Sequence, residues 1–216
     1  EENFTALHEV SLEIDSGAFM SFVGPSGSGK TTLLNLIGGL DVPTTGNIFF
    51  KERGLSSMSR EQMAEYRREN IGFIFQTYNL LPVYSVYENV LFPLLLNGDK
   101  EKDVRDRVME IVAKVGLTDQ FKKRPAQLSG GQCQRVAIAR ALVKDPLIIL
   151  ADEPTANLDT ENSLQILELM RQLNQQYQAA VIFSTHDEKV TRYVRREVKL
   201  EDGRVVSDKN NINGTA

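Results

Sequence analysis

A glycine-rich segment near the N-terminus carries the clearest chemical signal in the sequence. Residues 24–31 read Gly-Pro-Ser-Gly-Ser-Gly-Lys-Thr and match the pattern G-x-x-x-x-G-K-[ST]. The glycines let the backbone curl so that successive N–H groups point inward, and a helix that starts here adds the positive end of its dipole. Lys30 offers a positive charge to the β- and γ-phosphates of a nucleotide, and the Thr31 hydroxyl is a ligand for Mg²⁺. The residues expected to contact the nucleotide are Gly24, Pro25, Ser26, Gly27, Ser28, Gly29, Lys30, Thr31 and Thr32.

Two acidic residues, Asp152 and Glu153, follow the continuous apolar stretch 147–151. Such a stretch is typical of a strand buried on both faces of a parallel sheet, and ligands bind at the carboxyl ends of these strands. Asp152 is expected to hold Mg²⁺, directly or through water, and Glu153 to accept a proton from an attacking water. Alone, the pair also fits a solvated acidic turn. Together with the glycine-rich loop it favours hydrolysis of a nucleoside triphosphate.

His186 and Gln76 each follow another predicted strand. Because parallel strands end at one edge of a sheet, both side chains are expected near the carboxylates. His186 would contact the γ-phosphate or the water, although spacing alone equally fits an ordinary surface histidine. Gln76 also fits an ordinary polar strand end.

A second possible anion site lies at residues 128–132, Leu-Ser-Gly-Gly-Gln, just before a predicted helix. Ser129 can cap this helix, and the glycines leave backbone N–H groups uncovered, an arrangement that suits a phosphate. The simpler interpretation is a capped helix that binds nothing.

The surrounding elements alternate between strands and helices, which indicates an α/β core, while residues 77–145 are mainly helical. Apolar residues at helical spacing and in short runs define these elements. A hairpin turn is expected at Asp202-Gly203. Strands are expected over 10–14, 20–23, 47–50, 71–75, 147–151 and 179–184, and helices over 31–40, 60–69, 86–96, 104–115, 132–143 and 166–177.

The composition is that of an ordinary globular protein, with 41 % hydrophobic and 25 % charged residues among 216. The formal net charge of −4 provides no overall basic field for nucleic acid, although Lys122, Lys123 and Arg124 form a local basic patch. The longest apolar run, 90–96, is far shorter than the roughly 20 residues that a spanning helix needs. No nucleic-acid partner and no direct insertion into a membrane are therefore expected.

The motifs together resemble those of the ATP-binding-cassette (ABC) ATPases, in the same order and with similar spacing over residues 7 to about 207. The resemblance implies a P-loop core with a mixed sheet, an N-terminal antiparallel β part and an inserted helical subdomain. One domain would span residues 1–207, with the core at about 1–76 and 146–207, the helical subdomain at about 77–145, and a disordered polar tail at 208–216. The segments 37–41, 71–76, 79–82 and 88–90 look closest to the lipoprotein-release and macrolide-export group. The motifs that carry the family resemblance are residues 24–31, Gln76, residues 128–132, Asp152-Glu153, Ala156-Asn157-Leu158-Asp159 and His186.

The resemblance also implies partners and roles. Two cassettes would close head to tail as a homodimer around two ATP molecules with Mg²⁺. Residues Ser129, Gly130, Gly131 and Gln132 of one protomer would face the γ-phosphate held by the partner's Lys30. Gln76 would contact Mg²⁺ and water, and Asp159 would couple the two sites. A separate transmembrane permease would dock near residues 77–92, which would keep the chain at the cytoplasmic face of the inner membrane only through this partner.

The expected function is that of an ATP-hydrolysing motor subunit that drives export or release of a lipoprotein, drug or peptide-like cargo. Two alternatives stay open. The same ATP cycle could operate a regulatory clamp on a membrane partner without transport. A nucleic-acid ATPase with this cassette would carry a long coiled coil, but only about 120 residues separate Lys30 from Asp152 and they contain no sustained heptads.

Overall fold

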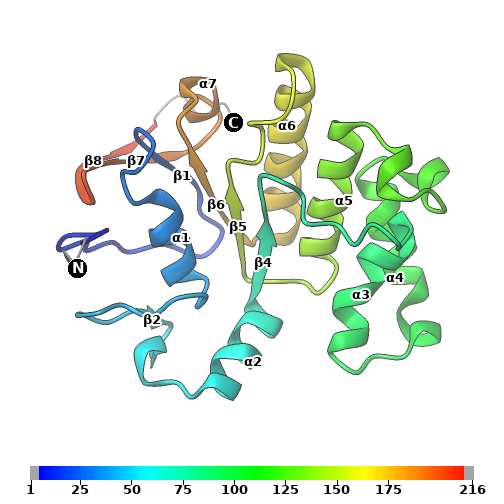
Figure 1. The fold of residues 1–216 in the computed structure, drawn as a ribbon, viewed down its shortest axis with the longest axis horizontal. Coiled ribbons are helices and arrows are strands. Elements are labelled where there is room, and N and C mark those ends of the chain that lie inside the picture. The colour runs from blue at the N-terminus through cyan, green and yellow to red at the C-terminus, as the bar shows by residue number, and fades with distance from the viewer. Residues whose placement is uncertain (1–4, 212–216) are drawn as a thin grey trace.

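The computed structural model describes residues 5–211, and a six-stranded mixed sheet forms its centre (Figure 1). The first four strands in spatial order run parallel, β1 also pairs in parallel with β7, and β7 pairs antiparallel with β8. The α/β class with a mixed sheet is therefore confirmed. In spatial order the strands are β4 (Ile71–Ile74), β5 (Ile148–Asp152), β6 (Ala180–Thr185), β1 (Phe19–Val23), β7 (Arg196–Glu201) and β8 (Arg204–Asn210).

Helices cover both faces of this sheet, because its central strands carry apolar residues on both sides. Met20, Leu150 and Ile182 pack on the face that holds α1 (Lys30–Ile37) and α2 (Arg60–Asn70). Val181 and Phe183 belong to the other core cluster, together with residues of α5 (Gly130–Leu142) and α6 (Thr160–Tyr177). Alternate residues of one strand thus reach different helices. This arrangement places α1 and α5 on opposite faces.

The helical region consists of α3 (Val86–Leu96), α4 (Glu101–Lys114) and α5, which pack on one another beside the sheet. The predicted apolar stripe of α4 is confirmed: Val108, Ile111 and Val112 are buried in the same cluster as α3 and α5. The remaining short helices are η1 (Leu55–Ser57), η2 (Thr118–Gln120), η3 (Pro125–Gln127) and α7 (Glu188–Thr191). No helix within residues 5–211 is long and apolar enough to cross a membrane.

Serine capping boxes fix the starts of three helices. Ser59, Ser85 and Ser129 each accept a hydrogen bond from the backbone N–H three residues later, whose side chain accepts one in return. Such reciprocal bonds satisfy donors that a helix N-terminus otherwise leaves without partners. The box at Ser85 explains why α3 begins where the sequence predicts.

The predictions of a strand at 10–14 and of a tail from residue 208 are wrong, and several helix and strand ends differ from the predicted ones by two to six residues. Residues 10–14 are extended but form no strand; Val10, Leu12 and Ile14 pack on the core, yet alternation requires only one buried face and not a ladder partner. Strand β8 continues to Asn210, so the predicted tail does not start at 208: Asp208 receives two hydrogen bonds from Arg196. Residues 212–216 lie outside the described residues.

The hairpin turn at Asp202-Gly203 is confirmed, since both residues have positive φ, 45° and 73°. A separate two-stranded antiparallel sheet joins β2 (Phe49–Phe50) to β3 (Arg53–Gly54).

Candidate active site

The predicted chemical residues gather at the carboxyl edge of the sheet. The loop 24–29 leaves the end of β1, Gln76 follows β4, and Asp152 ends β5. The strand register sets Asp152 opposite Ser184 of β6, and Val23 opposite Thr185. Four neighbouring parallel strands therefore deliver the glycine-rich loop, the carboxylates, Gln76 and His186 to one edge, as the sequence predicts.

The glycine-rich loop is held tightly against the β7–β8 hairpin. A Cβ on Gly24 would lie 2.1 Å from the Leu200 carbonyl oxygen, so only glycine fits there. Lys30 is buried, and its Nζ donates to the carbonyl oxygens of Gly24 and Pro25, each at 2.8 Å. Gly29 provides no side-chain cap for α1, which leaves N–H groups of its first turn open to an anion. The loop, the Lys30 amine and the start of α1 therefore lie together, an arrangement that suits the phosphates of a nucleotide.

Thr31 and Asp152 offer hard oxygen ligands side by side. The Thr31 hydroxyl donates to both carboxylate oxygens of Asp152, at 3.1 and 3.3 Å, and the Ser184 hydroxyl donates to the same carboxylate. Hydroxyl and carboxylate oxygens suit Mg²⁺, which typically takes one or two protein carboxylates and completes its shell with phosphates and water. Within residues 5–211 no group of three or more His, Cys, Asp or Glu could hold a metal by itself. The donor set fits Mg²⁺ bound together with a nucleotide.

Glu153 has a left-handed backbone, with φ at 47°, that turns its side chain away from the line of β5. Its N–H donates to the carbonyl oxygen of Ser184 at 3.1 Å and to the Ser184 hydroxyl at 3.2 Å. A carboxylate oxygen of Glu153 lies 2.8 Å from Nδ1 of His186. Because a carboxylate only accepts, this contact places the proton on Nδ1. The His186 side chain is 67 % exposed and that of Glu153 17 %, so the pair lies at the solvent edge of the site.

Ser184 is a site residue to which the sequence assigns no role, and Asn157 appears there only as a member of the motif at residues 156–159. Fully buried Ser184 contacts both acidic residues, donating to one and accepting from the other. Asn157 donates to the carbonyl oxygen of Gln76 at 2.9 Å, which fixes the backbone of that exposed glutamine. The only sequence signal for Ser184 is its place in a predicted strand. To recognise its role one must know the register that pairs it with Asp152 in β5, and that pairing joins distant parts of the chain.

The second predicted anion site is built as a capped helix start. Ser129 Oγ accepts from the Gln132 N–H at 3.2 Å, and Gln132 Oε1 accepts from the Ser129 N–H at 3.0 Å. Helix α5 packs on the sheet face opposite α1 (Figure 1), so one chain does not bring Ser129 to Lys30. Sequence reasoning expects the two to meet only between protomers, and the separation within the chain agrees with that expectation.

Asp159 lies near the second anion site and caps α6. Its carboxylate accepts from the Asn162 N–H at 2.9 Å and from Asn162 Nδ2 at 2.6 Å, and these hydrogen bonds lower the pKa of Asp159. A Cβ on Gly131 would lie 2.8 Å from Asn162 Oδ1, so the starts of α5 and α6 are in close contact.

A comparison with protein families matches residues 7–156 to the family described as ABC transporter. The matched range contains the glycine-rich loop, Gln76, Ser129 and both carboxylates, and spans more than half of the chain. The chain belongs to the ABC transporter family. The family and fold expected from the motifs are confirmed.

Solved structures support the same assignment. Two structures of the cassette MJ0796 are 41 % identical to this chain, with a TM-score of 0.86, over 95 % of this chain and 90 % of theirs. One is described as a dimeric post-hydrolysis state bound to ADP and Pi, the other as a dimeric bacterial ABC transporter cassette. CbiO1 from Clostridium perfringens, described as part of the ABC transporter complex cbiONQ, is 31 % identical, with a TM-score of 0.87 over 95 % of this chain and 82 % of its own. The chain is an ATP-binding cassette with ATPase activity.

Proposed function

We propose that this ABC cassette is the motor subunit of a transporter that works as a head-to-tail homodimer and drives a separate transmembrane permease. The segments 37–41, 71–76, 79–82 and 88–90 favour the lipoprotein-release and macrolide-export group. The cargo would then be a lipoprotein, a drug or a peptide-like molecule that is exported or released.

The chemistry divides among the residues at the sheet edge. Lys30 and the open N–H groups of α1 bind the phosphates and stabilise negative charge on them. Glu153 accepts a proton from the attacking water, and the 2.8 Å contact with His186 orients its carboxylate. Thr31, Asp152 and Gln76 would hold Mg²⁺, which when bound neutralises charge on the phosphates.

The main support for a dimer is that the two helix starts suited to anions, those of α1 and α5, belong to helices on opposite faces of the sheet. Lys30 begins α1 and Ser129 caps α5, and α1 and α5 belong to different core clusters. A second copy can supply the missing helix start, and two-fold symmetry then creates two equal sites from one set of motifs. The MJ0796 cassette, described as dimeric with ADP and Pi, supports this arrangement.

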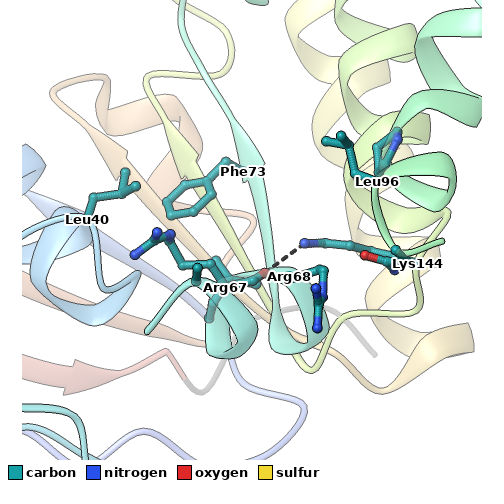
Figure 2. Close-up of a pocket in the computed structure, with 10 residues that line it drawn as sticks. Leu40, Arg67, Arg68, Phe73, Leu96 and Lys144 are labelled. Atoms are coloured by element: carbon teal, nitrogen blue, oxygen red, sulfur yellow. Dashed lines mark hydrogen bonds between the residues drawn. The ribbon is translucent and has the colours of Figure 1, made fainter. Parts of the chain in front are cut away.

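An open pocket of about 320 Å³ suggests where the membrane partner docks. Figure 2 shows Leu40 and Phe73 on one side and Leu96 on the other, with Lys144 donating to the Arg67 carbonyl oxygen at 2.8 Å. Among the described residues that line it are three cations and no acidic side chain. Its lining includes Pro93, which directly follows the region 77–92 where docking is expected, and it suits an apolar partner segment that carries a carboxylate. Its lining residues are Leu40, Ala64, Arg67, Arg68, Ile71, Phe73, Pro93, Leu96, Asn97 and Lys144.

A purification from membranes tests the transport function. The tagged chain should co-purify with a polytopic membrane protein, and cargo release by the complex in vesicles should require ATP and stop in Glu153→Gln. An ATP-dependent change in the partner with no cargo released would instead indicate a regulatory clamp. Stimulation of ATP hydrolysis by added DNA would favour a nucleic-acid ATPase. The chain should leave the membrane fraction when the partner is absent, since its contact with the inner face would depend on that partner.

A further inference from the structure

The loop after Gln76 contains two consecutive residues in a sterically unfavourable conformation. Tyr78 and Asn79 have φ of 61° and 46°, in the left-handed region that side chains with a Cβ rarely adopt. Such a conformation is strained for residues with a side chain and persists only where neighbouring contacts enforce it. Thr77 contributes locally, since its hydroxyl donates to Asn79 Oδ1 at 2.9 Å. These residues are the second and third after Gln76, so their backbone sets the direction in which the loop leaves it.

Arg140, 61 residues further along the chain, holds these two residues in place. Its Nη1 donates to the Asn79 carbonyl oxygen at 2.5 Å, and its Nη2 donates to the Tyr78 carbonyl oxygen at 2.7 Å. Burial lowers the pKa of the Arg140 guanidinium from its ordinary value. A planar guanidinium with two parallel donors matches two adjacent carbonyls in a way that a lysine ammonium does not.

Arg140 lies near the end of α5, whose beginning is capped by Ser129. The same loop also reaches that beginning, because a Cβ on Gly130 would lie 3.1 Å from the Tyr78 hydroxyl. Strand β4, which leads into Gln76, packs closely on α5 as well: a Cβ on Gly72 would lie 2.8 Å from the Ala141 carbonyl oxygen. The loop, the strand before it and α5 therefore form one continuous packed unit.

We propose that Arg140 is a positioning residue for Gln76, which clamps the loop 76–79 to α5 so that Gln76 and the Ser129 anion site move together. The inference rests on the proposed roles of Gln76 and Ser129. In the proposed head-to-tail dimer, each protomer contributes Ser129 to one active site and Gln76 to the other. A phosphate bound by Ser129 at the start of α5 would therefore change the placement of Gln76 in the second site.

Steady-state ATPase kinetics of Arg140→Ala test the clamp. We expect kcat to fall by about 10- to 100-fold, since a displacement near 1 Å can cost that much, while KM for ATP stays within about twofold. KM should change little because Arg140 donates to the loop after Gln76, whereas the phosphate-binding Lys30 and Thr31 bond to Gly24, Pro25 and Asp152. If KM for ATP rises by the same factor as kcat falls, or if kcat is unchanged, the proposal is overturned. Thermal melting establishes whether the variant is folded. If it is not, Arg140→Lys is used in its place, for which we expect a smaller fall in kcat, again with KM nearly unchanged.

Combination with Gln76→Ala separates positioning from general stabilisation. If Arg140 acts through Gln76, Arg140→Ala should slow Gln76→Ala little further, because effects of residues that act as one unit are not additive. Arg135→Ala is the matched control, since Arg135 is on the same helix but donates to the Val115 carbonyl oxygen and to Gln165. The fold reductions in kcat caused by Arg135→Ala and Gln76→Ala should multiply in the double variant. If the reductions caused by Arg140→Ala and Gln76→Ala also multiply, the clamp is overturned. A wild-type chain without ATPase activity would overturn the proposed function instead.

Discussion

Nδ1 of His186 lies 2.8 Å from a carboxylate oxygen of Glu153, although 33 residues separate them in the chain. The contact joins the residues that follow β5 and β6, two adjacent strands whose register also sets Asp152 opposite Ser184. Glu153 is thereby paired with His186, while its neighbour Asp152 faces Thr31 and Ser184. Two consecutive carboxylates thus have separate environments, which suits separate roles in proton transfer and metal binding.

Replacing Glu153 by Gln should nearly stop hydrolysis without preventing ATP binding. The amide keeps the size of the side chain but cannot accept the proton, a function worth about 10²- to 10⁴-fold in rate. We expect kcat to fall by that amount, with ATP-bound dimer accumulating because the reaction that opens it is blocked. Phosphate release and gel filtration with ATP measure the two effects. Hydrolysis at the normal rate would remove Glu153 from the mechanism.

Ser184→Ala should raise the Mg²⁺ concentration needed for half-maximal ATPase activity. The hydroxyl orients the Asp152 carboxylate, and loss of such a supporting hydrogen bond typically costs about 10- to 100-fold in metal affinity. Ser21→Ala is a matched control in the neighbouring strand β1, because this fully buried hydroxyl has no hydrogen-bond partner among the described residues. Titrations of activity with Mg²⁺ should shift for Ser184→Ala and stay in place for Ser21→Ala; two coincident curves would contradict the role of Ser184.

Lys144 should make the unfolding free energy depend on pH in the alkaline range. Burial lowers its pKa from 10.5 to about 8, so between these pH values the unfolded chain binds a proton that the folded chain has lost. The unfolding free energy should therefore rise with pH in this window, by at most about 1.4 kcal/mol per pH unit from this residue. Lys144→Met should remove that contribution.

Urea unfolding of both proteins from pH 7 to pH 10 measures the difference in slope. Wild type should gain stability relative to Lys144→Met as the pH rises through 8. Parallel pH profiles would mean that the amine is not desolvated in the pocket.

Much of the fold could be predicted because local signals specify it. The start of α3 follows from the cap at Ser85, and the apolar stripe of α4 shows which of its residues are buried. The catalytic edge could also be predicted, since the motif residues directly follow apolar strands. Residues 10–14 could not, because their alternation fits either a strand or an extended segment packed on one side.

The supporting residues of the site depend on pairings between distant segments. Ser184 is recognisable only once β5 and β6 are aligned, and Arg140 only once α5 is placed against the loop after Gln76. The positive φ of Tyr78 could not be predicted locally, because tyrosine rarely adopts it and the Arg140 contact that holds its carbonyl comes from α5. Asn79 is a residue type that tolerates positive φ, but it adopts this conformation in only a minority of its positions.

The central claim is that Ser129 of one protomer recognises the phosphate bound at Lys30 of its partner. Ser129→Asp tests it well, because aspartate is an equally good N-cap and keeps the helix start but adds a negative charge. Ser129→Asn is the uncharged control with a comparable capping preference.

Sedimentation velocity with ATP and Mg²⁺, carried out in the Glu153→Gln background, gives the decisive comparison. We expect dimers for Glu153→Gln alone and with Ser129→Asn, but monomers with Ser129→Asp, all with one ATP bound per chain. Dimers of the Ser129→Asp variant, or monomers throughout, would contradict the shared site.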